Sequence, residues 1–334
     1  MHSTDSPVSA VADPVPVTAD AQLAESACAL DATGTSTRAL ASFRVRLINF
    51  LAVTIPFAGL IVAIALLWGV AFDWVYLVLL VGMVFATGLG ITIGYHRLFT
   101  HRSFDTPRPI QHALAIMGSM AVEGPLLEWV ATHRKHHQHS DGDHDPHSPH
   151  GHGETFGGVV RGFIHAHFGW LFLRRARDIT RYCADLRRDP GLRRTSDLFV
   201  LWVILGLLLP AAIAGLVTWS WTGVLLGFLW GGLVRVFVVH HITWSINSVC
   251  HLWGGRPFAA GDESRNNVVF GVLGFGEGWH NNHHAFPTSA RHGLFWWQFD
   301  LSYAIIRLMG LVGLARKIKI PTPERMAAKR VVTR

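Results

Sequence analysis

The stretch Leu198–Val234, LFVLWVILGLLLPAAIAGLVTWSWTGVLLGFLWGGLV, contains no charged residue. About 20 residues of helix cross the hydrocarbon core of a membrane, so this stretch is long enough to cross almost twice. A polar break at Thr218–Thr222 supplies the turn between the two crossings. We therefore predict one membrane span near 198–217 and a second near 222–245.

Two more uncharged stretches lie earlier in the chain, at Leu47–Phe72 and Trp74–Tyr95. Hydrophobic residues make up 50% of the sequence and charged residues only 15%, whereas a soluble domain carries about a quarter charged residues. The sequence thus predicts an all-α membrane protein with four transmembrane helices, the first two near 47–72 and 74–95, and a helical cap outside the membrane.

The basic residues predict the orientation of these spans. Lys and Arg favour cytoplasmic loops, and the turns at Asp73 and at Thr218–Thr222 contain none. We therefore expect a multi-pass protein of the cell inner or plasma membrane, with both termini and the cap in the cytoplasm. The net charge of +7 then reflects topology and the anionic membrane surface, and we expect no nucleic-acid partner. Arg235 falls inside the fourth span, where it either pairs within the helix bundle or lies near its edge.

Residues outside the spans divide the chain further. We expect 1–42, rich in Ala, Ser, Thr, Asp and Pro, to be a disordered tail without a signal peptide. Residues 43–315 form the membrane domain, and 316–334 a basic surface tail. A further apolar helix is expected over Phe295–Leu314.

Nine histidines stand in four short motifs, HRLFTH, HRKHH, NSVCH and HNNHH, at the ends of spans or in the two cap segments. They are His96, His101, His133, His136, His137, His251, His280, His283 and His284. Neutral imidazole is the commonest protein ligand of transition metals. Nine are too many for one ion and suit two ions, for which iron is the first candidate.

The spacing within these motifs supports a shared metal site. His133, His136 and His137 stand at i, i+3 and i+4, which is one face of a helix, and the third histidine cluster repeats this spacing. Asn247 lies one helical turn before His251. His96 and His101 are five residues apart, so sharing an ion requires their helix to unwind locally or bend.

The chain resembles the membrane fatty-acid desaturase family, in particular its stearoyl-CoA (Δ9) type. The resemblance rests on GITIGYHRLFTHRSF, EWVATHRKHHQHSD, WSINSVCH and GEGWHNNHHAFPTSARHG, and covers about Ile48–Ala315. It implies that the nine histidines bind two iron ions and that Asn247 contacts one iron through a water. It also implies O2 as co-substrate and a cis double bond, at Δ9, in a saturated C16–C18 acyl chain carried as acyl-CoA.

No HPGG haem motif occurs in the sequence, so we expect electrons from a separate donor: a ferredoxin or flavin reductase system, or a cytochrome b5-like protein. Val84, Gly88 and Thr92 form an i, i+4 stripe that leads to His96, and we expect them to contact the acyl chain. Close helix packing is an alternative role for Gly88. Trp244 is a candidate contact for the thioester end.

The resemblance further implies that Arg174 and Arg175 meet the phosphates of CoA. Asp145 and Glu277 either orient ligand histidines or cap turns. The histidines of the loop 139–152 form either a zinc-loading tract or, as we expect, a solvated polar loop, and His292 is expected to be structural.

Three other functions remain open on the sequence alone. An acyl-lipid desaturase would use the same site on another carrier. A fatty-acid or alkane hydroxylase would use the same metals, and only its product would differ. A membrane metal-binding or transport protein is the third, although transport favours histidines spread across the bilayer depth, whereas these gather at one membrane face.

Overall fold

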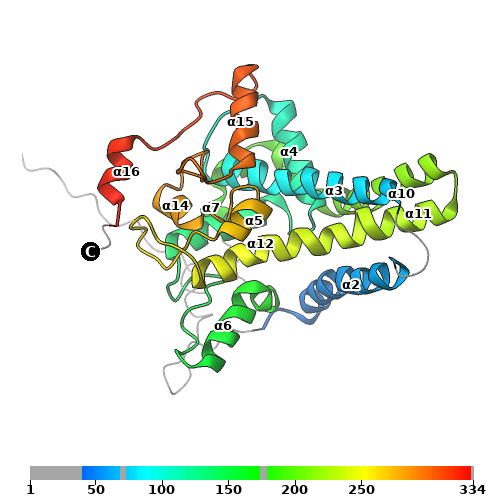
Figure 1. Ribbon diagram of the computed structural model, residues 1–334, viewed down its shortest axis with the longest axis horizontal. Helices are drawn as coiled ribbons and strands as arrows, with labels where there is room; N and C mark the ends of the chain where they lie inside the picture. The colour runs from blue at the N-terminus through cyan, green and yellow to red at the C-terminus, as the bar shows by residue number, and fades with distance from the viewer. Residues whose placement is uncertain (1–39, 68–72, 174–178, 332–334) are drawn as a thin grey trace, which may run out of the picture. The chain divides into compact units, whose positions relative to one another are not determined.

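The computed structural model describes residues 40–67, 73–173 and 179–331. Residues Ala41–Arg334 form one compact unit, and within its described part the chain is helical, with only isolated β-bridges (Figure 1). The predicted all-α class is confirmed.

Among the described residues of this unit, four helices are long and apolar enough to cross a membrane, as predicted. They are α2 (Phe43–Leu67), α3 (Trp74–Leu89) with its continuation η1 (Gly90–Thr100), α10 (Phe199–Thr218), and the continuous helix of α11 (Trp221–Gly227), η3 (Phe228–Val234) and α12 (Arg235–Leu252). Residues 68–72 of the first predicted span lie outside the described residues.

Two of these helices are longer than predicted. The second candidate span has 27 residues and ends at Thr100, and the fourth has 32 and ends at Leu252. At 1.5 Å per residue they are about 40 and 48 Å long, against about 30 Å of hydrocarbon. The sequence prediction ended them near residues 95 and 245, after about one bilayer thickness, but the helical hydrogen bonding continues. Both helices therefore extend beyond the bilayer and carry His96 and His251 with them.

Arg235 is fully buried and pairs inside the helix bundle. Its guanidinium donates to the carbonyl oxygens of Gly206 on α10, Gly231 on η3 and Met120. The Gly206 carbonyl is available because Pro210, four residues later, has no N–H to donate to it. Met120 ends α4 (Arg108–Met120), whose last carbonyls also lack helical partners. Arg235 thus fastens α4 to two membrane helices.

The remaining helices form the cap at one end of the long helices (Figure 1). They are α5 (Leu126–His139), α6 (Phe156–His167), η2 (Gly169–Phe172), α7 (Ile179–Tyr182), α8 (Ala184–Arg187), α9 (Pro190–Asp197), α13 (Val268–Leu273), α14 (His280–Ala285), α15 (Leu301–Leu311) and α16 (Pro323–Lys329).

The predicted helix over Phe295–Leu314 begins only at Leu301, because the Asp300 side chain accepts from Tyr303 N and caps α15. In the C-terminal segment, α16 is joined to the cap by backbone hydrogen bonds from Ala259 N to Lys329 O and from Val331 N to Pro257 O.

A buried apolar cluster holds η1 against α4, α5 and α15. Its members include Ile93, Tyr95, Phe104, Leu126, Val130 and Ile306. Half of the cluster lies on η1, α5 and α12, which carry motif histidines, so its packing fixes the direction in which these histidine side chains point.

Candidate metal centre

A π-helical segment presents the first two histidines. At the C-terminal end of η1, the N–H of the capping residue His101 donates to the carbonyl oxygen of His96 at 3.1 Å, and Thr100 Oγ1 donates to Tyr95 O at 2.8 Å. A π-helix turn brings residues i and i+5 together, whereas an α-helix turns them apart. The two imidazole rings consequently lie 4.8 Å apart, centroid to centroid. The predicted local change in the helix is confirmed.

Five histidines from three elements converge on one point. The ring nitrogens of this first group all lie within 4.8 Å of one another, and the group consists of His96, His101, His133, His137 and His283. The Nε2 atoms of His96 and His283 are 3.0 Å apart, and those of His283 and His137 are 2.9 Å apart.

The other four histidines form a second, fully buried group of the same kind: His136, His251, His280 and His284. The Nε2 atoms of His280 and His251 are 3.0 Å apart. Helices α5 and α14 each contribute to both groups, because neighbouring histidines such as His136 and His137 point to different sides of the helix. The structure therefore brings together all nine predicted histidines, as five and four.

The chemistry of these groups suits metal ions. Burial, followed by the charges of neighbouring histidines, holds the pKa of His133, His137 and His280 well below its ordinary value, so these imidazoles are neutral at pH 7. The buried Nε2 atoms of His101, His136 and His284 have no hydrogen-bond partner in the described part of the chain. Two nitrogens bound at right angles about 2.1 Å from one metal are about 3.0 Å apart, which matches the Nε2 separations.

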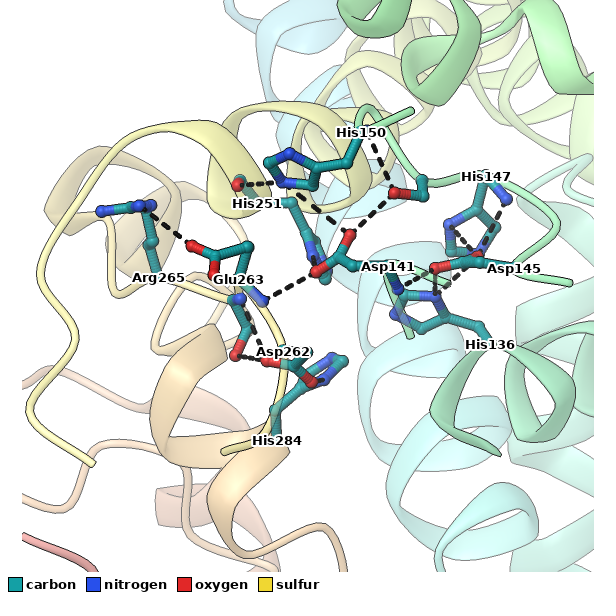
Figure 2. A network of polar contacts seen from close by, with 12 residues as sticks. His136, Asp141, Asp145, His147, His150, His251, Asp262, Glu263, Arg265 and His284 are labelled. Atoms are coloured by element: carbon teal, nitrogen blue, oxygen red, sulfur yellow. Dashed lines mark hydrogen bonds and ion pairs between the residues drawn. The ribbon is translucent and has the colours of Figure 1, made fainter. Parts of the chain in front are cut away.

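Four carboxylates fix the orientation of four of these rings through Nδ1. Glu277 contacts His96 Nδ1 at 2.5 Å, and Asp145 contacts His136 Nδ1 at 2.9 Å. The other two pairs are Asp141 with His251, at 2.9 Å, and Asp262 with His284, at 2.5 Å (Figure 2). A carboxylate at Nδ1 keeps the proton there and turns the Nε2 lone pair toward the centre.

Sequence reasoning considered only two of these carboxylates. The contacts confirm an orienting position for Asp145 and Glu277. Asp141 and Asp262 were missed, because their partners lie 110 and 22 residues away along the chain and no local spacing links them.

The Glu277 carboxylate lies in a buried charge cluster. The fully buried Arg97 lies 3.0 Å from Asp300 and 3.4 Å from Glu277. Burial opposes ionisation of Glu277, but His96 and Arg97 outweigh it and hold its pKa well below the ordinary value. His292, expected to be only structural, lies 3.4 Å from Glu277, and its ring centroid is 4.4 Å from that of His283. Burial, then Arg97, lowers the pKa of His292 to about 4.

The polar loop after α5 covers the second group and is not wholly solvated. Asp145, His147 and Ser148 are buried, and the side chain of His150 hydrogen-bonds to the carbonyl oxygen of His251 at 3.0 Å (Figure 2). The expectation of a solvated loop is therefore wrong for this part of it. The reason is Asp141 and Asp145, whose contacts with His251 and His136 hold the loop against the centre.

The predicted substrate residues are less closely grouped. Thr92 Oγ1 lies 2.7 Å from Ser302 Oγ on α15. A Cβ on Gly88 would lie 2.7 Å from Phe275 Cε2, so close packing accounts for this glycine as well as an acyl-chain role does. Val84 is partly buried beside the apolar cluster, and Trp244 is buried with its ring 4.6 Å from that of His240.

Asn247 lies on α12 one turn before His251 and is partly buried. Arg174 and Arg175 lie outside the described residues.

Comparison with known proteins agrees with this centre. The family model described as fatty acid desaturase matches residues 72–309. The hex-5-enoyl-[acyl-carrier protein] acetylenase of Moorena producens is 43% identical over 83% of this chain and 87% of its own. The sn-1 stearoyl-lipid 9-desaturase of Anabaena variabilis is 43% identical over 70% of this chain and 79% of its own. The icosanoyl-CoA 5-desaturase of Limnanthes douglasii is 38% identical over 75% of this chain and 65% of its own. The chain therefore belongs to the fatty acid desaturase family and is a membrane oxidoreductase that acts on acyl chains.

Proposed function

We propose that this protein is an O2-dependent di-iron desaturase that forms a cis double bond at Δ9 in saturated C16–C18 acyl chains. One iron would be held by the first group of five histidines. The other would be held by the second group of four, with Asn247 contacting it through a water. The observation that carries the proposal is the convergence of nine histidines, six of them buried and three partly buried, from the ends of two membrane helices and from α5 and α14.

Bound iron would supply the oxidising power, drawn from O2 and two external electrons, that removal of hydrogen from an unactivated methylene requires. The protein's own part is to keep the imidazoles unprotonated, to fix their rings and to exclude water. Burial lowers the pKa of His133 and His280, and the four carboxylates hold the Nδ1 protons of their histidines. The centre lies at the ends of η1 and α12, which continue two membrane helices, so an acyl chain would approach it from the membrane.

We propose acyl-CoA as the carrier, on the resemblance to the stearoyl-CoA type, with Val84, Gly88, Thr92 and Trp244 contacting the chain and Arg174 and Arg175 the CoA phosphates. Acyl-lipid is the second candidate, because the Anabaena relative is a stearoyl-lipid desaturase by name. Electrons would come from a separate ferredoxin, flavin reductase or cytochrome b5-like donor. Both termini and the centre would face the cytoplasm.

Fatty-acid analysis of a desaturase-deficient host expressing the chain tests the reaction, with double bonds located by mass spectrometry. We expect a new Δ9 monoene in wild type and none in a His136→Ala variant, which loses a buried histidine of the second group. A hydroxy acid that also disappears in His136→Ala would instead identify a hydroxylase.

A pulse of labelled stearate distinguishes the carriers. If the substrate is acyl-CoA, labelled oleate appears in the CoA pool before it appears in glycerolipid. If the substrate is acyl-lipid, saturated label enters glycerolipid first, and the double bond appears there without passing through oleoyl-CoA.

A further inference from the structure

The cap carries an exposed apolar surface close to the membrane helices. Seven of its side chains are 48–94% exposed, although each is large and apolar: Val268, Val269, Val272, Leu273, Trp296, Trp297 and Phe299. We call this the α13–Trp297 surface. Soluble proteins rarely leave such a contiguous patch open to water, and the segments 266–276 and 294–299 contain no charged residue.

Trp279 joins the two segments of this surface. Its indole N–H donates to Phe299 O at 2.7 Å, and its ring lies 5.3 Å from that of Trp297. On its other side it packs against Gly271 of α13, where an added Cβ would lie 2.6 Å from the indole. The buried Trp279 thus holds α13 and the Trp297 loop as neighbours.

The end of α13 also packs against two membrane helices. The ring of Phe275 lies 5.0 Å from that of Phe85 on α3, and Gly274 approaches Ile242 of α12. Phe85 stands eleven residues before His96, and Ile242 nine before His251. At 1.5 Å per residue, these contacts lie about 13–16 Å from the metal-binding ends of the two helices, toward the bilayer.

From this continuity we infer that the α13–Trp297 surface is inserted into the membrane. The segment would be a fifth membrane-embedded element that does not span the bilayer, and its occupant would be the acyl chains and interfacial layer of the leaflet next to the metal centre. Tryptophan side chains favour this interfacial layer, and apolar segments of this kind insert about 5–10 Å deep. A docked protein is the disfavoured occupant, because the segments 266–276 and 294–299 themselves contain no charge to orient a partner.

For the enzyme, this means that the chain between His251 and His280 contacts the bilayer twice, through α12 before it and through α13 within it. The chain leaves the membrane with α12, returns to it at α13, and re-enters the cap at His280. Lipid around α13 would therefore adjoin the metal centre directly.

Site-directed spin labelling of the full-length protein in lipid nanodiscs tests this inference. Single cysteines replace Val269, Leu273 and Trp296 in a Cys28→Ser background, since Cys183 and Cys250 are buried. Leu205, exposed on the membrane helix α10, is the lipid-facing reference, and Ala328, exposed on α16, is the water-facing reference. Each label is probed by collision with O2, which partitions into lipid, and with a water-soluble nickel chelate.

We expect the ratio of O2 to nickel accessibility at the three sites to be several-fold higher than at Ala328 and to approach that at Leu205. The purified protein has no partner in the nanodisc, so only lipid can produce this result. A ratio at Val269 and Leu273 equal to that at Ala328 would overturn the inference. Three separate sites keep the test decisive if one labelled variant does not fold, and the readout does not depend on enzymatic activity.

Discussion

Asp141 and His251 are 110 residues apart in the chain, yet Asp141 Oδ2 lies 2.9 Å from His251 Nδ1. The same oxygen accepts a hydrogen bond from Glu263 N at 2.8 Å. Burial opposes ionisation of Asp141, but its contacts with His251 outweigh burial and lower its pKa below the ordinary value. One ionised carboxylate therefore links the loop after α5, the end of α12 and the segment before α13.

Asp141→Asn should weaken retention of metal in the second histidine group. The amide keeps the size of the side chain but loses the charge that holds the Nδ1 proton of His251, and loss of such a contact typically costs 10–100-fold in metal affinity. We expect iron per protein to fall by about half after a chelator challenge, measured by mass spectrometry of the metal.

The matched control is Asp105→Asn, because Asp105 is an exposed carboxylate paired only with the exposed Lys317 among its described ion pairs. It should retain iron like wild type. Equal retention in Asp141→Asn and Asp105→Asn would show that the contact does not position His251.

The four candidate membrane helices and the motifs of all nine converging histidines could be predicted from the sequence, because both are local patterns. Uncharged length predicts a span, and i, i+3 and i+4 spacing predicts one face of a helix. The orienting aspartates Asp141 and Asp262 could not be predicted, since tertiary folding alone brings them to their histidines. The division of the histidines into five and four likewise depends on how α5 and α14 face each other.

Glu123→Gln should change how stability depends on pH. Burial raises the pKa of Glu123 to about 7, and its Oε2 accepts from Trp129 Nε1 at 3.1 Å. A carboxyl with a raised folded-state pKa is stabilising at low pH, and wild type loses that contribution as pH rises from about 4.5 to about 7. The free energy of unfolding of wild type falls by at most about 1.4 kcal/mol per pH unit over this range, or by about 1–3 kcal/mol in all.

Thermal melting of both proteins from pH 5 to pH 8 measures this effect. The melting temperature of Glu123→Gln should rise relative to wild type up to about pH 7 and then stay parallel to it. Glu128→Gln, from the first turn of α5, is the control and should follow wild type. Parallel profiles for Glu123→Gln across the whole range would contradict the raised pKa.

Gly88→Phe should shorten the acyl chain that the enzyme accepts. If the stripe of Val84, Gly88 and Thr92 contacts the acyl chain, added bulk removes room for the terminal methylenes. Each methylene that no longer fits changes the rate ratio between two chain lengths by about tenfold or more. We expect the ratio of C16 to C18 products to rise at least about tenfold, measured in the host lipids.

Close packing of Gly88 on Phe275 requires a second variant. In Gly88→Phe/Phe275→Ala the smaller residue makes room for the new ring, so the fold should recover while the product ratio stays shifted. A double variant with the wild-type product ratio would assign Gly88 to helix packing alone.

Arg235→Leu should destabilise the membrane domain, because it leaves the carbonyl oxygens of Gly206, Gly231 and Met120 without their buried donor. Each buried acceptor left unpaired costs about 1–3 kcal/mol. Pro210 offers an internal rescue. Pro210→Ala restores the backbone N–H that pairs with Gly206 O in a regular helix. The double variant should therefore melt at a higher temperature than Arg235→Leu, by the equivalent of one buried carbonyl oxygen paired again. Pro210→Ala alone should melt close to wild type, where Arg235 already satisfies that oxygen. Thermal melting of the three variants in detergent measures all these differences. If Pro210→Ala gave no recovery in the Arg235→Leu background, the Gly206 carbonyl would not be what Arg235 stabilises.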